Sequence, residues 1–262
     1  MLLKILSYNI HKGFDWNNKN YFLQEMKDFI KHSGADIVFL QEVVGKNSKY
    51  QAQGMVDSQF EFLADQLWPH FSYGHNAVYD HGHHGNLILS KFPIESFENI
   101  NLSTNNWEQR GLLVCKIILP TIKNLEASQG PKEKFFYAAC SHLNLLHAGR
   151  LLQYQQIKKH ILLKNGNHDI PFILAGDFND WNKKSAHIFE VDLGMQEVHK
   201  TVHGAFAKTF PAIYPIFCLD RIYVKNLKIK TSIILETKNK HNLISHLSDH
   251  LPLYCEVEIN GA

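Results

Sequence analysis

Two polar side chains, Asp177 and Asn179, follow the apolar run at residues 170–174. Such a run is typical of a buried strand, and Gly176 lets the chain leave it without a side chain in the way. Residues i and i+2 of an extended segment point the same way, so we expect both side chains to face one pocket at the carboxyl end of a strand. A carboxylate and an amide placed side by side can orient a water molecule. An Asx-rich turn that caps a helix starting near Asn182 explains these residues equally well.

Other polar residues stand at the ends of predicted strands, at Asn9, Glu42, His142, Asp220 and the pair Asp249-His250. Taken singly, each of these is compatible with a surface acid, an edge charge or a buried structural histidine. Together they supply the groups that one reaction mechanism requires. The oxygens of Asn9, Glu42 and Asp249 suit Mg²⁺, or Mn²⁺, which neutralises phosphate charge during hydrolysis.

The histidines of this set indicate proton chemistry. His142 and His250 can donate hydrogen bonds to phosphoryl oxygens or move protons. A histidine that acts in this way needs an acid to orient its second ring nitrogen, and Asp220 is the natural partner of His250. With Asp177 and Asn179 on the attacking water, the inventory fits in-line hydrolysis of a phosphate ester.

The elements that must position these residues alternate between strands and helices. We predict one α/β domain over residues 1–262, because no linker divides the chain and the site needs both halves. Predicted strands lie at residues 2–10, 36–40, 71–75, 86–90, 111–119, 134–140, 170–174, 219–224, 228–236 and 253–259. Predicted helices lie at residues 17–32, 59–67, 147–163 and 182–191. Residues 43–58, 77–85 and 120–133 are predicted loops, the last a mobile hairpin tip.

The composition is that of an ordinary globular protein, with 45% apolar and 20% charged residues among 262 and a formal net charge of +2. This net charge gives no evidence of a large basic surface for binding nucleic acid, although a weak basic bias suits an anionic substrate. The four cysteines are interpreted as unpaired, which favours a reducing compartment. We find no signal peptide, and no stretch approaches the roughly 18 apolar residues of a spanning helix. We therefore expect a soluble, cytoplasmic protein without a transmembrane segment or an obligate protein partner.

Eight segments carry a family resemblance: Tyr8-Asn9-Ile10, Leu40-Gln41-Glu42, residues 85–94, Ser141-His142-Leu143, Arg150 with Gln153, Gly176-Asp177-Phe178-Asn179, Leu219-Asp220-Arg221-Ile222 and Ser248-Asp249-His250. In this order they resemble the endonuclease/exonuclease/phosphatase superfamily, which is DNase I-like and includes deoxyribonucleases, repair nucleases, sphingomyelinases and inositol polyphosphate phosphatases. The chain is most similar to a small stand-alone bacterial branch. The motifs are weak singly, but the ordered set spans nearly the whole chain.

The resemblance implies a four-layer α/β sandwich, with two mixed sheets packed face to face and helices outside. It also implies roles: Glu42 as the main Mg²⁺ ligand with Asn9 beside it, Asp177 and Asn179 on the water, Asp220 and His250 as an acid–histidine pair, and Asp249 as a metal or water-shell acid. Repair nucleases of abasic sites carry tyrosine where this chain has His142, so the resemblance leans away from them. They also carry an acid where this chain has His11, which puts a second metal in doubt.

Substrate choice is expected to reside in the loops. Arg110 and Arg150 are candidate phosphate ligands, although Arg150 opens a predicted helix and is equally compatible with a structural role. Asn86 of the segment 85–94 is a further predicted substrate contact. The histidines of residues 75–84 either cover an anionic substrate or belong to a solvated loop. Trp16, Trp107 and Trp181 are candidates for base stacking, a lipid interface or the core.

The leading hypothesis is a Mg²⁺-dependent phosphodiesterase, with nucleic acid as the default substrate. A phospholipid or sphingomyelin-type phosphodiesterase, or a phosphomonoesterase, is the alternative. The phospholipid hypothesis requires an apolar rim near the site, for which residues 43–58 and 120–133 are the predicted places. A catalytically silent binding domain is the third hypothesis, disfavoured because no main site residue is missing.

Overall fold

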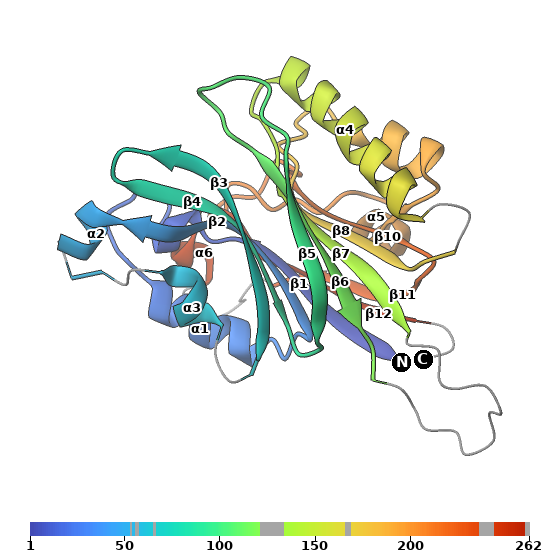
Figure 1. Ribbon diagram of the computed structural model, residues 1–262, viewed down its shortest axis with the longest axis horizontal. Coiled ribbons are helices and arrows are strands. Elements are labelled where there is room, and N and C mark those ends of the chain that lie inside the picture. The colour runs from blue at the N-terminus through green and yellow to red at the C-terminus, as the bar shows by residue number, and fades with distance from the viewer. Residues whose placement is uncertain are drawn as a thin grey trace.

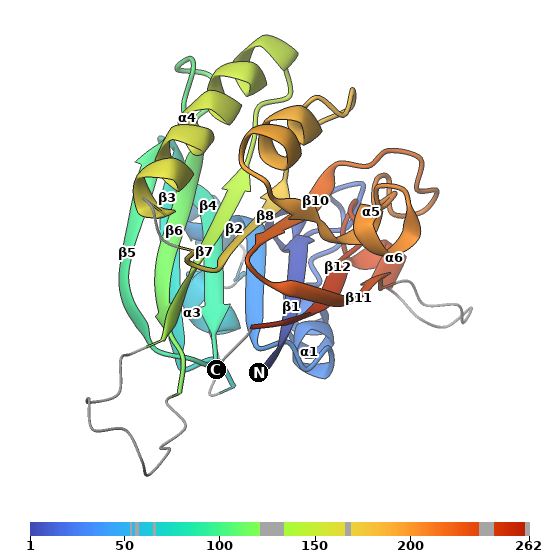
Figure 2. The same cartoon turned by 90° about the vertical axis from the view of Figure 1, so that its right-hand side faces the viewer.

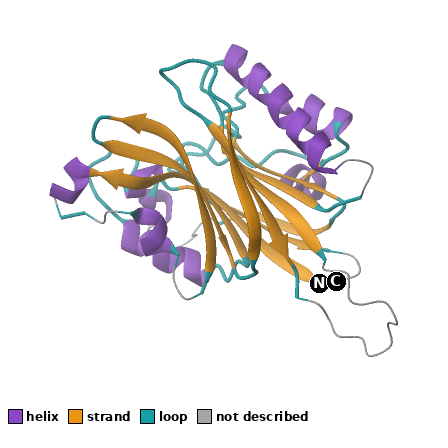
Figure 3. Cartoon of the chain, in the orientation of Figure 1, coloured by secondary structure: helices purple, strands orange, loops and turns teal. Residues whose placement is uncertain are grey.

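A computed structural model describes residues 1–52, 54–55, 58–64, 67–120, 134–165, 169–235 and 244–259. Its centre is formed by two six-stranded β-sheets that lie face to face (Figure 1). Helices lie on the outer sides of this pair of sheets (Figure 3). The predicted four-layer sandwich of two mixed sheets with outer helices is therefore confirmed.

The first sheet has the strand order β11-β12-β1-β2-β4-β3. Only β1 and β2 are parallel within it, and the remaining neighbours are antiparallel. Its strands are β1 (Leu2–Asn9), β2 (Ile37–Asn47), β3 (His70–Tyr79), β4 (Gly82–Ser90), β11 (Lys228–Ile234) and β12 (Leu253–Glu258).

The second sheet has the order β5-β6-β7-β8-β10-β9, and only β7 and β8 are parallel. Its strands are β5 (Ile94–Asn101), β6 (Gly111–Ile118), β7 (Phe135–His142), β8 (Phe172–Asp177), β9 (Gln196–Glu197) and β10 (Asp220–Lys225). Each sheet thus holds one parallel pair near its middle. The carboxyl ends of the two pairs carry Asn9 with Glu42 and His142 with Asp177.

The helical elements are η1 (His11–Gly13), α1 (Leu23–His32), α2 (Ser48–Ala52), α3 (Gln59–Leu63), α4 (His147–Asn165), the π-helical turn η2 (His187–Asp192), α5 (Val198–His203) and α6 (Ile244–Leu247). The helices α1 and α3 cover the first sheet, and α4 covers the second (Figure 1). In the turned view of Figure 2, α5 lies against β10 and β11, at the edge where the two sheets meet. None of the helices in the described ranges is both long and apolar enough to cross a bilayer.

Three buried apolar clusters fill the spaces between the four layers. The cluster between the sheets includes Ile5, Phe39, Phe136 and Ile173. A second cluster places Met26 and Ile30 of α1 against the first sheet, and a third places Tyr154, Ile157 and Ile161 of α4 against the second. Successive side chains of a strand point to opposite faces of the sheet, and both faces are buried here. The central strands therefore appear in the sequence as continuous apolar runs.

Several predicted boundaries are wrong, for local reasons. Residues 43–58 contain the end of β2 and the helix α2 instead of a long loop, because register shifts after Leu40 and Val44 break the alternation that signals a strand. Residues 77–85 likewise belong to the β3–β4 hairpin, apart from its turn. Strand β5 was not predicted, because its residues are mostly exposed. The predicted helix at 182–191 begins only at Ser185, and the predicted tip at 121–133 lies outside the described residues.

The cysteine interpretation holds in the structure. All four cysteines are free, and Cys115, Cys140 and Cys255 are buried. Burial raises the pKa of the Cys140 thiol to about 12, so this side chain packs as a small apolar group.

Candidate active site

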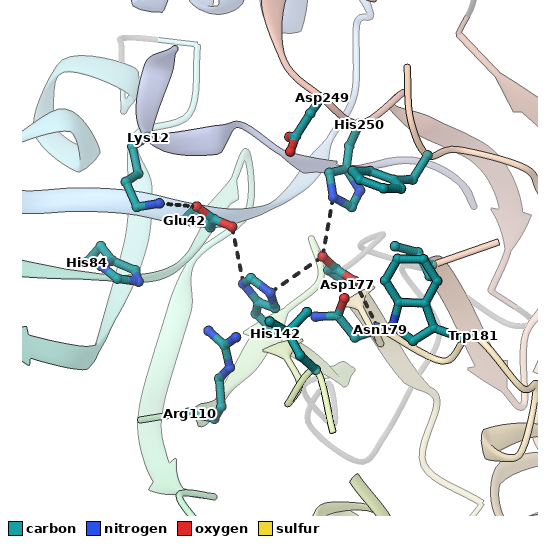
Figure 4. A pocket seen from close by; sticks show the side chains of 13 residues that line it. Lys12, Glu42, His84, Arg110, His142, Asp177, Asn179, Trp181, Asp249 and His250 are labelled. Atoms are coloured by element: carbon teal, nitrogen blue, oxygen red, sulfur yellow. Dashed lines mark hydrogen bonds and ion pairs between the residues drawn. The ribbon is translucent and has the colours of Figure 1, made fainter. Parts of the chain in front are cut away.

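A cleft of about 320 Å³ opens where the carboxyl ends of the two parallel strand pairs meet (Figure 4). Strand ends and loops from both halves of the chain contribute to it. Its lining residues are Lys12, Glu42, His84, Arg110, His142, Leu145, Asp177, Asn179, Trp181, Phe210, Leu219, Asp249 and His250. Seven of the eleven predicted site residues are among them, and two more, Asn9 and Asp220, touch lining residues from behind.

Asp177 is the centre of the cleft's hydrogen-bonding network. Its Oδ1 accepts the backbone N–H of Asn179 at 2.9 Å, and its Oδ2 accepts from the Asn9 amide at 3.1 Å. The Nε2 atoms of His142 and His250 each lie 3.5 Å from the same Oδ2 (Figure 4). Asp177 is buried, so these contacts fix its carboxylate in one orientation.

Close strand packing positions this carboxylate. Gly176 has φ +146°, and a Cβ atom there would lie 1.9 Å from the carbonyl oxygen of Ser141 on β7. Glycine is therefore required for β8 to approach β7 and to align Asp177 with His142 at the strand ends. The helix cap that competes with the catalytic interpretation belongs to Asp180, whose carboxylate accepts from the backbone N–H groups of Lys184 and Ser185. Asp177 is free of that structural task.

The two histidines differ in protonation state. Burial and the nearby Arg110 guanidinium lower the pKa of His142 to about 3, although Asp177 and Glu42 oppose the shift. Burial also disfavours protonation of His250, but Asp220 and Asp177 raise its pKa to about 10. The Nδ1 of His250 lies 2.8 Å from Asp220 Oδ2, so the predicted acid–histidine contact is present. At neutral pH, His142 is a neutral imidazole and His250 an imidazolium.

Glu42 stands on the opposite wall, in the bulge where β2 shifts its register against β4. Its backbone has φ +57°, and bulges of this kind aim a side chain into a site. One carboxylate oxygen, Oε2, lies 2.6 Å from Lys12 Nζ, and Oε1 lies 3.4 Å from the Asn9 amide nitrogen. Burial opposes ionisation of Glu42, but the Lys12 ammonium, together with His142 and His11, holds the pKa of this carboxyl well below its usual range.

Backbone strain gathers around the cleft. His11, Lys12, Glu42 and Asn179 are non-glycine residues with positive φ, and all four lie at or beside the cleft wall. Such conformations cost about 1–3 kcal/mol each and persist only where the surroundings impose them. Half of the eight non-glycine residues with positive φ in the described ranges are therefore at or beside the cleft.

Two arrangements in the cleft bear on a divalent metal ion. Ligand atoms of Asp177, Asp220 and His250 lie within 4.8 Å of one another. In this group the His250 ring already contacts both acids, with Nδ1 2.8 Å from Asp220 Oδ2 and Nε2 3.5 Å from Asp177 Oδ2. Glu42 fits better, because it is an ionised carboxylate that faces the cleft. The Asn9 amide nitrogen donates to both Glu42 and Asp177 and so links the two carboxylates, while its oxygen accepts from the His11 N–H.

The three predicted substrate contacts fall in different places. Arg110 lines the cleft and pairs with Glu108 at 3.0 Å. Asn86 is buried beside the cleft, where its amide donates to the carbonyls of Gly111 and Cys140. The prediction for Arg150 is corrected: its buried guanidinium donates to backbone carbonyls of the loop after β7, and it does not line the cleft. Its task is to hold that loop.

The structure adds residues that the sequence did not single out. Lys12 and Leu145 line the cleft. His84, one of the histidines that either cover an anionic substrate or lie in a solvated loop on the sequence interpretation, also reaches it, from β4. Burial, followed by the charge of Lys12, lowers the pKa of His84 to about 4, so this imidazole is neutral. The signal for Lys12 was its place three residues after Asn9, in a turn that ends at Gly13.

Comparisons with known proteins agree with this geometry. The family model "Endonuclease/Exonuclease/phosphatase family" matches residues 6–250. The uncharacterized protein YbhP of Escherichia coli (strain K12) is 40% identical over 260 residues, which cover 98% of this chain and 96% of that protein.

Two solved structures share the fold. An endonuclease/exonuclease/phosphatase from Beutenbergia cavernae DSM 12333 has a TM-score of 0.77 at 17% identity, covering 100% of this chain and 72% of its own. D. rerio TDP2 complexed with single strand DNA product has a TM-score of 0.69 at 19% identity, covering 98% of this chain and 99% of its own.

Members of the matched family are hydrolases that act on phosphate esters and generally use a divalent metal. The cleft has the acids, histidines and basic residues that such a reaction needs, at the strand ends where the family's motifs fall. A family model over residues 6–250 and a relative 40% identical over nearly the whole chain lead to one conclusion: the protein belongs to the endonuclease/exonuclease/phosphatase family and is a phosphoester hydrolase.

Proposed function

We propose that the protein is a Mg²⁺-dependent phosphodiesterase that acts by in-line attack of water. One observation carries this proposal: a single buried carboxylate oxygen, Asp177 Oδ2, lies 3.5 Å from a neutral and from a protonated imidazole. Groups in opposite protonation states around one carboxylate are suited to take a proton at one point and to give one at another.

The roles we propose follow from charge and position. Asp177 accepts the proton of the attacking water, and Asn179 helps to hold that water. His250, kept protonated by Asp220, donates to a phosphoryl oxygen or to the leaving group. His142 and Arg110 stabilise phosphoryl oxygens from the other side of the cleft.

Glu42 is the proposed Mg²⁺ ligand, with Asn9 and Asp249 as supporting residues; Mn²⁺ suits the same oxygen donors. A divalent ion in this position supplies neutralisation of phosphate charge. Asp249 lines the same cleft, and its Oδ1 lies 3.7 Å from His11 Nδ1. We keep the cytoplasmic location and the single domain over residues 1–262 as predictions.

The test is an assay of purified protein in Mg²⁺ against plasmid DNA, RNA, bis-nitrophenyl phosphate, nitrophenyl phosphate and phospholipid vesicles. We expect hydrolysis of the diesters, loss of activity in EDTA, and loss in Asp177→Ala. Activity that survives in Asp177→Ala contradicts the proposed role of Asp177. Cleavage of the monoester alone contradicts the diesterase assignment.

Nucleic acid remains the default substrate, and a relative in fold, TDP2, is described with a DNA product. A second candidate, a phospholipid, is favoured by an apolar rim at the cleft. On one side, Trp107 is 98% exposed and Leu146 71% exposed, and the Glu108 carboxylate joins their loops by accepting the Leu145 N–H at 2.8 Å. On the other side, Trp181 packs on Phe217 of the loop 210–217, where Tyr214 is 75% exposed.

Exposed aromatic and aliphatic side chains around a polar cleft suit a substrate with a phosphate head and apolar chains. This rim lies in loops other than the two predicted for it. Leu146→Ser is expected to lower activity on vesicles several-fold and to leave activity on bis-nitrophenyl phosphate unchanged. Leu163→Ser is the matched control, because Leu163 is 68% exposed at the other end of α4. Equal effects of both variants on vesicles contradict the lipid candidate.

A further inference from the structure

Lys12 is the cationic side chain nearest to Glu42 in the cleft. Its ammonium lies 2.6 Å from Oε2 of Glu42, and both side chains are largely buried, with 29% and 16% of their surface exposed. Figure 4 shows the lysine reaching this carboxylate from the side of the cleft opposite His142. The roles proposed above leave Lys12 without a task.

The backbone around Lys12 is built to present this ammonium. Lys12 itself has φ +58° in the short turn η1. The amide of the fully buried Gln59 donates to the Lys12 carbonyl at 2.7 Å, and its oxygen accepts from the Val44 N–H at 2.9 Å. Val44 lies two residues beyond Glu42 on β2. One buried side chain therefore ties the lysine's turn to the strand of its carboxylate.

The next residue enforces the same turn. Gly13 has φ +86°, and a Cβ atom there would lie 2.8 Å from the Tyr21 ring and 3.2 Å from the Gln59 amide nitrogen. A larger residue would displace Gln59 and the lysine's backbone with it. The ammonium is therefore held at Glu42 by the fold, in contrast to a surface lysine that samples many positions.

We propose that Lys12 is the resident counter-cation of Glu42, which competes with the divalent metal ion for this carboxylate and thereby weakens metal binding. This inference rests on the proposed metal-dependent function. An ammonium and a Mg²⁺ ion repel each other, and both seek the same oxygens. The metal-free protein keeps its ionised Glu42 compensated, and the ion binds only by displacing or sharing that contact.

The chain offers a matched control for this pair. Lys91 Nζ lies 3.0 Å from Asp36 Oδ1, and the two side chains are 29% and 19% exposed. Neither residue lines the cleft. Lys91→Met removes an ion pair of the same burial with no metal ligand in it.

The first test is calorimetric titration of Mg²⁺ into metal-free wild type, Lys12→Met, Lys12→Arg and Lys91→Met. We expect Lys12→Met to bind Mg²⁺ roughly tenfold more tightly than wild type, because a unit positive charge beside the ion is gone. Lys12→Arg and Lys91→Met should stay within about threefold of wild type, because each retains the cleft's charge. Unchanged or weaker Mg²⁺ binding by Lys12→Met overturns the inference.

Thermal unfolding gives a second readout that does not require activity. In EDTA, Lys12→Met should unfold at a lower temperature than wild type, because its Glu42 carboxylate has lost its cation. Added Mg²⁺ should then raise the unfolding temperature of Lys12→Met more than that of wild type. If Lys91→Met shows the same gain from Mg²⁺, a resident counter-cation at Glu42 is ruled out.

The two proposals fail in different ways. If wild type binds no Mg²⁺ and Lys12→Met binds none either, the metal-dependent function and the inference on Lys12 both fall. If wild type binds Mg²⁺ and loses activity in EDTA while Lys12→Met binds no more tightly, only the inference on Lys12 falls.

Discussion

The two parallel strand pairs of the molecule present different chemistry from the same structural position. In the first sheet, β1 ends in Asn9, and Glu42 directly follows the part of β2 that pairs with β1. In the second sheet, β7 and β8 end in His142 and Asp177. Both pairs lie near the middle of a six-stranded sheet, and their carboxyl ends share one cleft. Each end supplies one carboxylate that is fixed by hydrogen bonds.

The partners of the two carboxylates differ. Glu42 contacts the Lys12 ammonium. Burial alone would lower the pKa of Lys12, but the Glu42 carboxylate raises it, so Lys12 stays charged at neutral pH. Asp177 contacts two imidazoles, one neutral and one protonated. A carboxylate among fixed charges is suited to hold a cation, and one among imidazoles is suited to exchange protons. With the roles proposed above, metal binding and proton exchange fall on different sheets.

Asp177→Asn should have the largest effect on the reaction. The amide cannot accept a proton, so we expect kcat to fall by at least about 10³-fold, within the range of general base catalysis. Mg²⁺ affinity, measured by calorimetry, should change by less than about threefold, because the charge beside Glu42 is retained. Asp180→Asn is the control, since that buried carboxylate caps the following turn outside the cleft; it should lower the unfolding temperature and leave kcat intact. A kcat for Asp177→Asn near that of wild type contradicts the division of tasks.

Glu42→Gln tests the other strand pair. Removing this charge should weaken Mg²⁺ binding by about 10²-fold, as expected for loss of a main carboxylate ligand. Activity at limiting Mg²⁺ should fall with it and recover in part at high Mg²⁺, whereas Asp177→Asn should show no such recovery. If the two variants have the same metal affinity and the same response to Mg²⁺, the two carboxylates do not have separate tasks.

Asp220→Asn should have a smaller effect, because Asp220 acts through His250. We expect a 10- to 10²-fold loss of kcat, comparable to that of a misoriented acid–base group. The pKa of His250 should fall from about 10, since the Asp220 carboxylate is the main cause of the raise against burial. The alkaline limb of the pH–rate profile should therefore move to lower pH. A loss of rate without this movement would indicate that Asp220 only supports the fold.

Much of this comparison could be read from the sequence. The strands that carry Asn9, Glu42, His142 and Asp177 are buried on both faces, so their apolar runs and polar ends are visible in the chain. The ordered motifs then indicated the sandwich. What remained hidden depends on contacts between distant segments. Arg110 and Arg150 look equivalent as arginines, but one faces the cleft and the other supports backbone carbonyls.

Lys12 shows why such contacts escape sequence patterns. Its partner is 30 residues away, and the contact requires a left-handed turn, a bulge at Glu42 and the buried Gln59 between them. No periodicity encodes that combination. The outer part of the β3–β4 hairpin, at residues 77–85, escaped for a related reason: its polar and histidine-rich residues lack the alternation by which a half-buried strand is recognised.

The smallest predicted effect is on the pH dependence of stability. His142 and His250 are expected to change stability with pH in opposite directions. His142 has a folded pKa of about 3, so between that value and pH 6.5 the unfolded chain binds a proton that the folded chain does not, and stability falls as the pH is lowered. His250 has a folded pKa of about 10, so its contribution is complete below pH 6.5 and is lost as the pH rises toward 10. Each slope is at most about 1.4 kcal/mol per pH unit, or about 2–4 °C for a chain of this size.

Unfolding temperatures measured in EDTA from pH 4 to 9.5 should show that His142→Asn loses part of the acid slope and His250→Asn part of the alkaline slope. If both variants lose the same limb, the two imidazoles do not differ in protonation state, and the contrast between a proton donor and a neutral partner at Asp177 fails.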